Sequence, residues 1–402
     1  MDVLVIGGGL AAASAIGALR DEGFDGRITL IGEEPLLPYE RPPLSKEFLR
    51  GEDTEPRLVR PAEWYVEHDV RTRLGVRAQR LLARERAVEL EGGERIAFDV
   101  AIVATGSRPR RLPIPGLELD GVFDLRFLDD AERLRHAAAD ASKAVLVGMG
   151  FIGAEVAASF RQLGLDVVVV EPFATPLERV LGPELGGAIE ALHRDHGVEM
   201  VFGDAAERFE GDRRFEALVT TRGRRVEGDL AVVGVGVEPA TAIVGPEVEV
   251  GDGIWVDAEL RTSVPGVFAI GDVARHDHPV FGPVRVEHFD RAIKQGVTVA
   301  RNVLGGHEPF DDAMWFWSDQ YESQIQMCGY ATEWDDMVVR GSIQDRSFAA
   351  FLLKDGVLRS TFTMDWRSDC RRSMPLIVAR ARPDPALLAD PGFDLRTLHP
   401  PR

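Results

Sequence analysis

The sequence predicts an α/β protein with two units of the same parallel-sheet design, followed by a C-terminal α+β domain. A buried apolar run, a glycine-rich turn, an alanine-rich helical stretch and a second apolar run start at residue 3, and the same order returns near residue 144. These are two βαβ units roughly 140 residues apart, which is an internal repeat. After about residue 309, aromatic residues and alternating strand-like runs indicate a separate α+β domain.

The composition fits a folded protein of this size. The 402 residues are 45% hydrophobic, which excludes a largely disordered chain. With 47 Lys and Arg against 66 Asp and Glu, the net charge is −19, which argues against general nucleic-acid or anionic-membrane binding. The two cysteines, Cys328 and Cys370, can build neither a disulfide framework nor a cysteine-rich metal site. We therefore expect a cytoplasmic protein without a metal centre.

Near the start of the chain, residues 3–19 carry no charge, as in a signal-peptide core. A secretory signal needs a basic start, however, and the chain begins Met1-Asp2. The glycines at residues 7–9 also make a poor membrane-spanning helix. We expect neither a signal peptide nor an anchor.

The first unit is expected to run strand, turn, helix, strand. Residues 3–6 are too short for a helix and rich in β-branched side chains, so they predict a parallel strand. Residues 10–20 predict a helix and residues 28–31 the next strand. A further buried strand at residues 100–104 is followed by a proline-rich crossover at residues 108–116.

The second unit repeats this order with a strand at residues 144–147, a helix at residues 151–163 and a strand at residues 167–170. A later strand, residues 230–235, runs into a second crossover at residues 236–239. Beyond it, residues 267–270 predict a strand that ends in Gly271-Asp272, and residues 348–353 are a strand of the last domain.

The first turn carries a dinucleotide fingerprint, Gly7-x-Gly9-x-x-Ala12. Glycines there let the backbone approach a pyrophosphate, whose charge meets the helix N-terminus. An acid at the end of the second strand would bind the adenosine ribose, and Glu33 is the candidate, with Glu34 next. The alternative is a glycine-rich turn without a ligand.

The second turn carries a complete fingerprint, Gly148-x-Gly150-x-x-Gly153, with Glu171 closing the following strand. A carboxylate there accepts a hydrogen bond from the ribose 2′-hydroxyl and repels a 2′-phosphate, which favours NADH over NADPH. Two fingerprints imply two Rossmann-like domains and two dinucleotides. A flavoprotein that takes hydride from NADH onto FAD is the simplest reason to bind both.

At this point the residues resemble a known family, the FAD-dependent NADH:ferredoxin reductases of Rieske-type oxygenase and bacterial cytochrome P450 systems, within the glutathione-reductase-like two-dinucleotide superfamily. The resemblance covers nearly the whole chain. Four segments carry it: Pro38-Tyr39-Glu40-Arg41-Pro42-Pro43-Leu44-Ser45-Lys46, Ala104-Thr105-Gly106, residues 262–272 and Trp315-Phe316-Trp317-Ser318-Asp319-Gln320. It implies FAD on the first fingerprint and NADH on the second.

The resemblance also implies roles for individual residues. Lys46 would lie against the flavin, Glu155 near the nicotinamide, and Trp317 near the flavin on the ferredoxin side. The further residues implied for FAD are Gly7, Gly9, Ala11, Ala12, Glu33, Arg41, Ala78, Ala104, Thr105, Gly106, Arg126, Gly271, Asp272 and Phe289. Those implied for NADH are Gly148, Gly150, Phe151, Ile152, Gly153, Glu171, Gly236 and Glu287. The plainer alternatives are a solvated Lys46, an exposed helical Glu155, an Asp272 that caps a helix, and a Trp317 that packs in a core.

The route of the electrons follows from where cysteine is missing. Residues 33–46, after the second strand, hold no cysteine, so no dithiol can relay electrons from the flavin. We expect single electrons to pass directly to a small iron–sulfur ferredoxin of the [2Fe–2S] kind, which feeds a P450 or Rieske-type oxygenase. Rubredoxin as acceptor, or a slow-turnover NADH-gated redox-sensing interaction protein, remains an alternative.

The docking surface and the domain limits complete the expectations. An acidic reductase needs a local basic patch for an acidic ferredoxin. Candidates are Arg291 with Lys294, and Arg367, Arg371 and Arg372, unless these are only solvated charges. We expect an FAD-binding domain at residues 1–109 and 238–310, an NADH-binding domain at residues 110–237, and a C-terminal domain at residues 311–402.

Overall fold

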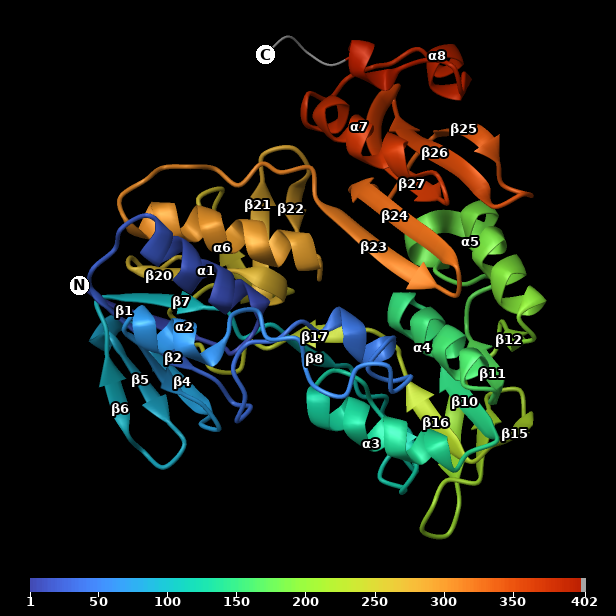
Figure 1. Ribbon diagram of the computed structural model, residues 1–402, viewed down its shortest axis with the longest axis horizontal. Coiled ribbons are helices and arrows are strands. Elements are labelled where there is room, and N and C mark those ends of the chain that lie inside the picture. Colours follow the sequence, from blue (N-terminus) through green and yellow to red (C-terminus); the bar gives the residue numbers. More distant parts are fainter. Residues whose placement is uncertain (399–402) are drawn as a thin grey trace. The chain divides into compact units, whose positions relative to one another are not determined.

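The computed structural model describes residues 1–398 (Figure 1). The chain forms two compact units. The first unit is Met1–Glu40, Arg57–Arg108 and Glu238–Phe316, and the second is Arg41–Pro56, Pro109–Val237 and the chain from Trp317 on. Residues 41–56, which the sequence analysis assigned to the FAD-binding domain, therefore group with the second unit. The physical reason is packing, because Leu49 is buried in the second unit's core and the Arg135 guanidinium lies 4.6 Å from the ring centroid of Phe48.

The first unit is built on a five-stranded parallel sheet of order β20-β7-β1-β2-β3. Its strands coincide with the predicted apolar runs: β1 (Asp2–Ile6), β2 (Arg27–Ile31), β3 (Val70–Arg73), β7 (Val100–Val103) and β20 (Val267–Ala269). In β1 every residue after Asp2 is buried, which explains a continuous apolar run rather than an alternating one.

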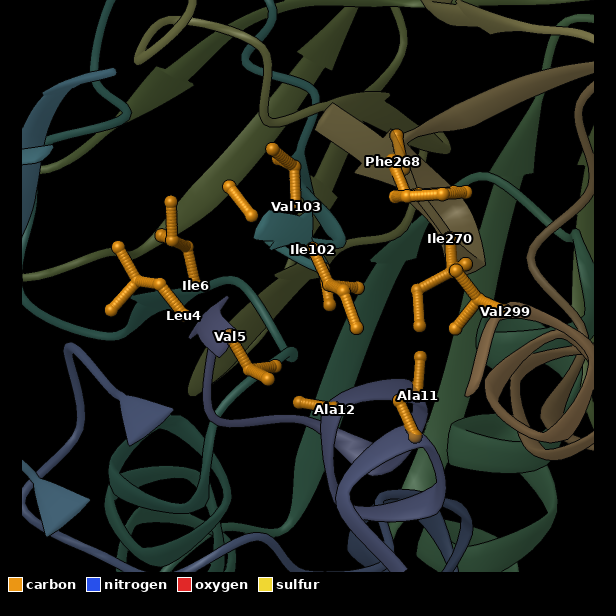
Figure 2. Packing of buried hydrophobic residues seen from close by; sticks show 14 of the residues in the cluster. Leu4, Val5, Ile6, Ala11, Ala12, Ile102, Val103, Phe268, Ile270 and Val299 are labelled. Carbon is orange, nitrogen blue, oxygen red and sulfur yellow. The ribbon is translucent and has the colours of Figure 1, made fainter. Parts of the chain in front are cut away.

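Helices α1 (Leu10–Asp21) and α6 (Phe289–Val303) pack side by side on this sheet (Figure 1). Gly296 makes the close approach possible, because a Cβ there would lie 2.6 Å from the Cβ of Ser14. Figure 2 shows the core of this unit, where side chains of β1, α1, β7 and α6, such as Val5, Ala12 and Val299, form one cluster.

Smaller elements complete the first unit. They are the sheet β4 (Ala78–Leu82), β5 (Ala87–Leu90) and β6 (Arg95–Ala97), the sheet β18 (Val250–Gly251), β19 (Gly253–Val256), β21 (Ala274–His278) and β22 (Gly282–Val284), the helix α2 (Ala62–Glu67), and the 3-10 turns η2 (Ala83–Glu85) and η3 (Gly271–Val273).

The second unit repeats the design with a parallel sheet of order β12-β11-β10-β16-β9. As in the first unit, the first strand of the unit's βαβ motif lies between the second strand and a later one, so the predicted repeat is a repeat of topology. The strands are β9 (Val122–Phe123), β10 (Lys143–Val147), β11 (Asp166–Glu171), β12 (Glu199–Phe202) and β16 (Leu230–Val233). The other elements are η1 (Pro42–Ser45), α3 (Leu128–Ala139), α4 (Phe151–Gln162), α5 (Glu178–Asp195) and the sheet β13 (Ala206–Glu210), β14 (Ala217–Thr220) and β15 (Arg225–Glu227).

The C-terminal part is a five-stranded sheet of order β23-β24-β27-β26-β25, with antiparallel pairing, followed by helices. Its elements are β23 (Trp315–Gln320), β24 (Ser323–Gly329), β25 (Asp336–Ser342), β26 (Ser347–Lys354), β27 (Val357–Met364), α7 (Arg367–Val378), α8 (Pro385–Ala389) and η4 (Leu395–Leu398). The buried Arg340 holds the last turns by an ion pair with Asp369 at 3.0 Å and by a hydrogen bond to the Leu388 carbonyl. Sheets and helices together confirm the predicted α/β class with an α+β domain at the end.

The two proline-containing crossovers differ in detail from the prediction, since each contains a short strand, β8 (Ser107–Pro109) and β17 (Val237–Pro239). Proline is tolerated because it is the last residue of both strands, where no backbone N–H is needed for a hydrogen bond to a neighbouring strand. In residues 1–398, no helix is both long and apolar enough to cross a membrane.

Candidate functional site

The first glycine turn, between β1 and α1, is shaped for close approach. Gly7 has φ +119°, and a Cβ there would lie 2.1 Å from the Ala104 carbonyl oxygen, so only glycine fits. Gly9 is the N-cap of α1, and a Cβ there would meet no described atom within 4 Å. Ala11 and Ala12 are buried under the turn. The α1 N-terminus therefore opens onto space that a diphosphate can use.

Residues from the ends of β7 and β20 join this turn, because both strands belong to the same parallel sheet as β1. Thr105 donates to the Ala240 carbonyl at 2.8 Å, and Gly106 has φ +69°. Asp272 lies within η3 and accepts a hydrogen bond from the Ser107 hydroxyl at 2.8 Å. It is therefore not a helix N-cap, a position that Ile270 holds in η3.

Helix α6 carries buried polar atoms that have no hydrogen-bond partner among the described residues, and it brings them to the same edge of the sheet. Gln295 is fully buried, and its Oε1 accepts from the Gly271 N–H at 2.8 Å. Its Nε2 finds no hydrogen-bond partner among the described residues, and neither does Nε of the buried Arg291. Burial lowers the pKa of Arg291 to about 10. Buried donors without partners are rare in proteins, so these atoms fit a polar ligand such as FAD.

The remaining residues predicted for FAD are dispersed. Glu33, just after β2, is about half exposed and forms ion pairs with Arg77 and Arg108. Ala78 begins β4, and Phe289 begins α6 with His288 as its N-cap. Glu287, predicted for the nicotinamide pocket, belongs to the first unit and is paired with Arg285.

Three residues predicted to face the flavin or its diphosphate, Arg41, Lys46 and Arg126, belong to the second unit. The Arg41 guanidinium lies 5.0 Å from the ring centroid of Phe127, the neighbour of Arg126. The backbone N–H of Arg126 donates to Asp130 at 3.1 Å, just before α3 begins. Arg41 and Arg126 thus share one region of the second unit.

The second glycine turn, between β10 and α4, repeats the geometry of the first. Gly148 has φ +92°, and a Cβ there would lie 2.6 Å from the Gly234 carbonyl oxygen. Gly150 is the N-cap of α4, and a Cβ there would meet no described atom within 4 Å. Phe151 and Ile152 form the first turn, and the Ile152 side chain is 48% exposed, an apolar surface beside the open turn. Gly236 also borders open space, since it has φ +97° and a Cβ there would meet no described atom within 4 Å.

Glu171 closes β11 directly beside this turn and is buried. Its Oε2 accepts from the Met149 N–H at 2.7 Å and its Oε1 from the Phe173 N–H at 3.1 Å. Each carboxylate oxygen can accept a second hydrogen bond. The side chain is therefore fixed in place with acceptor capacity left for a ribose hydroxyl.

The structure brings Lys46 and Glu155 together. Lys46 Nζ lies 2.8 Å from Oε2 of Glu155, and both side chains are buried. Ser45 donates to the same oxygen at 2.5 Å, and Ser318 of β23 donates to Oε1 at 2.7 Å. Glu155 is thus a buried carboxylate with three donors, and neither it nor Lys46 is the solvated charge that a single sequence position would suggest.

Sequence reasoning missed Ser45 and Ser318, although both stand next to predicted site residues. Ser45 precedes Lys46 and Ser318 follows Trp317. Both serines lie in segments that carry the family resemblance, and this position was the signal that could have identified them. Trp317 is half-buried, and because side chains alternate along a strand, it points away from the face that carries Ser318.

The predicted docking patch needs a correction at Arg291. Its side chain is fully buried, with the guanidinium donating to the carbonyls of Val286 and Ala274, so it cannot face a partner. Lys294 is paired with Asp290 and Asp312, and Arg372 with Asp369. Arg371 is exposed, and the side chain of Arg367 lies outside the described part.

The two cysteines lie in the C-terminal part and are buried. The Cys328 thiol donates to the Cys370 carbonyl at 3.0 Å, and burial raises the pKa of Cys328 well above its usual value. Such a thiol stays protonated and is a poor nucleophile.

Comparison with known proteins agrees with this geometry. A family model described as pyridine nucleotide-disulphide oxidoreductase matches residues 1–296, over the two glycine turns. The chain belongs to the pyridine nucleotide-disulphide oxidoreductase family. A second model, described as reductase C-terminal, matches residues 315–399.

The relatives include ferredoxin reductases, as the resemblance implied. Rhodocoxin reductase of Rhodococcus erythropolis is 37% identical, over 98% of this chain and 94% of its own length. The chlorobenzene dioxygenase ferredoxin reductase component of Cupriavidus sp. (strain PS12) is 36% identical, over 98% and 97%. The crystal structure of the ferredoxin reductase for the CYP199A2 system from Rhodopseudomonas palustris has a TM-score of 0.95 and 34% identity, covering 99% of this chain and all of that one.

Proposed function

We propose that this chain takes hydride from NADH onto FAD and passes single electrons to a small ferredoxin that serves a P450 or Rieske-type oxygenase. The family is one of FAD-dependent NAD(P)H oxidoreductases, and ferredoxin reductase components of such systems are its relatives. The observation that carries the proposal is the pair of open helix N-termini, Gly9 on α1 and Gly150 on α4, each behind a parallel strand. When bound, FAD accepts the hydride and gives up its electrons one at a time, chemistry that no side chain supplies.

The residues of the first unit suit FAD. The α1 N-terminus at Gly9 would hold the diphosphate, and the unused Gln295 Nε2 would donate to a polar group of the cofactor. Asp272, oriented by Ser107, would accept from the ribityl hydroxyls. Glu33, which is ion-paired with Arg77 and Arg108, would accept a hydrogen bond from the adenosine ribose.

The residues of the second unit suit NADH. The α4 N-terminus at Gly150 would hold the pyrophosphate, and Glu171 would accept from the ribose 2′-hydroxyl. Because that carboxylate is buried and fixed, a 2′-phosphate would meet uncompensated repulsion. Lys46 and Glu155 form an ion pair, so the two buried side chains together carry no net charge. In this arrangement, Lys46 would offer a cation to the flavin and Glu155 would offer a hydrogen-bond acceptor near the nicotinamide.

Two further predictions, the location and the domain limits, are kept as proposals. We place the protein in the cytoplasm, where two unpaired thiols are the usual state. We also keep the division into an FAD-binding, an NADH-binding and a C-terminal domain, with residues 41–56 as a segment that the second unit holds.

The test is anaerobic stopped-flow spectroscopy on the purified flavoprotein, with flavin absorbance as the signal. NADH should bleach the flavin, and a [2Fe–2S] ferredoxin from the same organism should restore the colour rapidly. Restoration by rubredoxin but not by ferredoxin would favour the alternative acceptor. A long-lived complex with NAD⁺ and slow reoxidation by both carriers would favour the redox sensor, and no bleaching would contradict the proposal.

A further inference from the structure

A continuous chain of buried polar side chains leads away from Glu155 inside the second unit. Ser318 and Gln320 lie two residues apart on β23 and so share one face of the strand. Gln320 Nε2 lies 3.2 Å from Ser318 Oγ, and Gln320 Oε1 lies 3.0 Å from Nε2 of His193 on α5. His193 Nδ1 lies 3.1 Å from the Tyr321 hydroxyl. None of these contacts serves a helix or strand ladder.

The chemistry of each group fixes the direction of the chain. The Glu155 carboxylate only accepts, so the Ser318 hydroxyl must donate to it, at 2.7 Å. Ser318 then accepts from the Gln320 amide, whose carbonyl oxygen is left facing His193. His193 must therefore carry its proton on Nε2 and accept from Tyr321 on Nδ1. Every donor in the chain points toward Glu155.

The surroundings of the chain support this arrangement. Ser318, Gln320 and His193 are fully buried, so water does not compete for their hydrogen bonds. Burial lowers the pKa of His193 to about 4, which keeps the ring neutral, with one donor and one acceptor nitrogen. In such a setting, hydrogen bonds that share a direction polarise and strengthen one another.

We propose that Ser318, Gln320 and His193 are positioning residues for Glu155, and that their one-way chain of donors holds its carboxylate in a single orientation. The inference rests on the proposed role of Glu155 near the nicotinamide. It gives β23 of the C-terminal part a task in the reaction with NADH, in addition to any contact with an electron acceptor.

The direction of the chain can be tested without activity, by ¹⁵N NMR of the imidazole nitrogens in the oxidised holoenzyme. We expect His193 to show a protonated Nε2 and a bare Nδ1, and to keep that pattern at pH 5.5, where an ordinary histidine is charged. A proton on Nδ1, or a charged ring at pH 5.5, would overturn the inference.

The effect on the reaction is tested by flavin reduction at saturating NADH. Gln320→Met keeps the size of the side chain and removes its hydrogen bonds, and we expect an approximately 10-fold lower limiting rate with NADH affinity changed less than about twofold. The matched control, Gln324→Met on β24, lies outside the chain and should behave as wild type. Ser318→Thr should recover most of the rate that Ser318→Ala loses, because it keeps the hydroxyl.

The outcomes separate the inference from the proposed function. If NADH reduces the wild type and Gln320→Met at equal limiting rates, the positioning role is overturned while the reductase function stands. If Gln320→Met and Gln324→Met slow equally, the effect is general and the inference is also wrong. If NADH does not reduce the wild-type flavin, the proposed function fails and takes the inference with it.

Discussion

At the scale of single residues, the Lys46–Glu155 pair is the most informative feature of the molecule. Both charges are buried, 2.8 Å apart, with serine hydroxyls on both carboxylate oxygens. Desolvation of such a pair is costly, and apolar side chains of similar size often stabilise a fold equally well. Because stability alone does not require a buried ion pair, we propose that this pair acts at a bound cofactor.

Breaking this pair on one side should damage stability and reaction together. Lys46→Met leaves an unpaired buried carboxylate, and we expect the free energy of unfolding to fall by about 3–5 kcal/mol. Lys46→Met with Glu155→Gln removes both charges and should recover most of that loss, yet flavin reduction by NADH should stay slow. Urea unfolding and stopped-flow reduction measure the two effects. Equal instability of the single and double variants would contradict a charge-pairing role.

At the same scale, the proposal that Glu171 selects NADH over NADPH can be tested by substitution. Glu171→Gln keeps its size and one backbone contact but removes the charge, so NADH affinity should fall about 10-fold as a charged hydrogen bond is lost. Discrimination against NADPH should weaken, and Glu171→Arg should favour NADPH further. The control is Glu199→Gln, because Glu199 is an exposed glutamate paired with Arg224. It should leave both cofactor affinities unchanged. An unchanged ratio of NADH to NADPH affinity would remove Glu171 from the ribose site.

At the scale of elements, the two strand–turn–helix units are where sequence and structure agree most closely. Glycine spacing, the short apolar strands and the helical stretches predicted β1, α1, β10 and α4 to within a residue or two, because each is a local pattern. The donor chain around Glu155 could not be predicted, since Glu155 and its partner Ser318 are 163 residues apart and meet only through tertiary packing. The burial of Arg291 was unpredictable for the same reason.

The second glycine turn allows ligand binding and folding to be separated by two neighbouring substitutions. Gly150→Ala meets no described atom, so it should lower the free energy of unfolding by less than about 1 kcal/mol while NADH affinity falls about 10-fold. Gly148 has φ +92°, and a Cβ there would lie 2.6 Å from the Gly234 carbonyl oxygen. Gly148→Ala should therefore lower the free energy of unfolding by about 1–3 kcal/mol. Thermal unfolding and NADH titration distinguish them. If Gly150→Ala bound NADH normally, the α4 N-terminus would not be the pyrophosphate site.

At the scale of the whole molecule, we expect electrons to leave the flavin without passing through a protein thiol. The chain has two cysteines, both buried in the C-terminal part, although the family takes its name from disulphide chemistry. Cys328→Ala with Cys370→Ala should keep NADH-to-ferredoxin turnover within about twofold. Alkylation of the wild type by iodoacetamide should be slow at pH 8, because the raised pKa of Cys328 keeps thiolate scarce below it. Loss of turnover in a double variant that stays folded and retains FAD would contradict direct transfer.

At the same scale, we propose that Trp317 takes part in electron transfer to the partner protein. The side chain is half-buried on β23, on the opposite face from Ser318, so its removal should leave the donor chain to Glu155 intact. We expect Trp317→Ala to slow reduction of ferredoxin about 10-fold or more, because a large aromatic contact at an interface contributes at least about 1.4 kcal/mol. Reduction of ferricyanide, a small acceptor that needs no docking surface, should change less than about twofold. Trp255→Ala on β19 controls for the loss of a partly exposed tryptophan elsewhere. Equal losses with both acceptors would return Trp317 to a packing role and move the search for the docking surface away from β23.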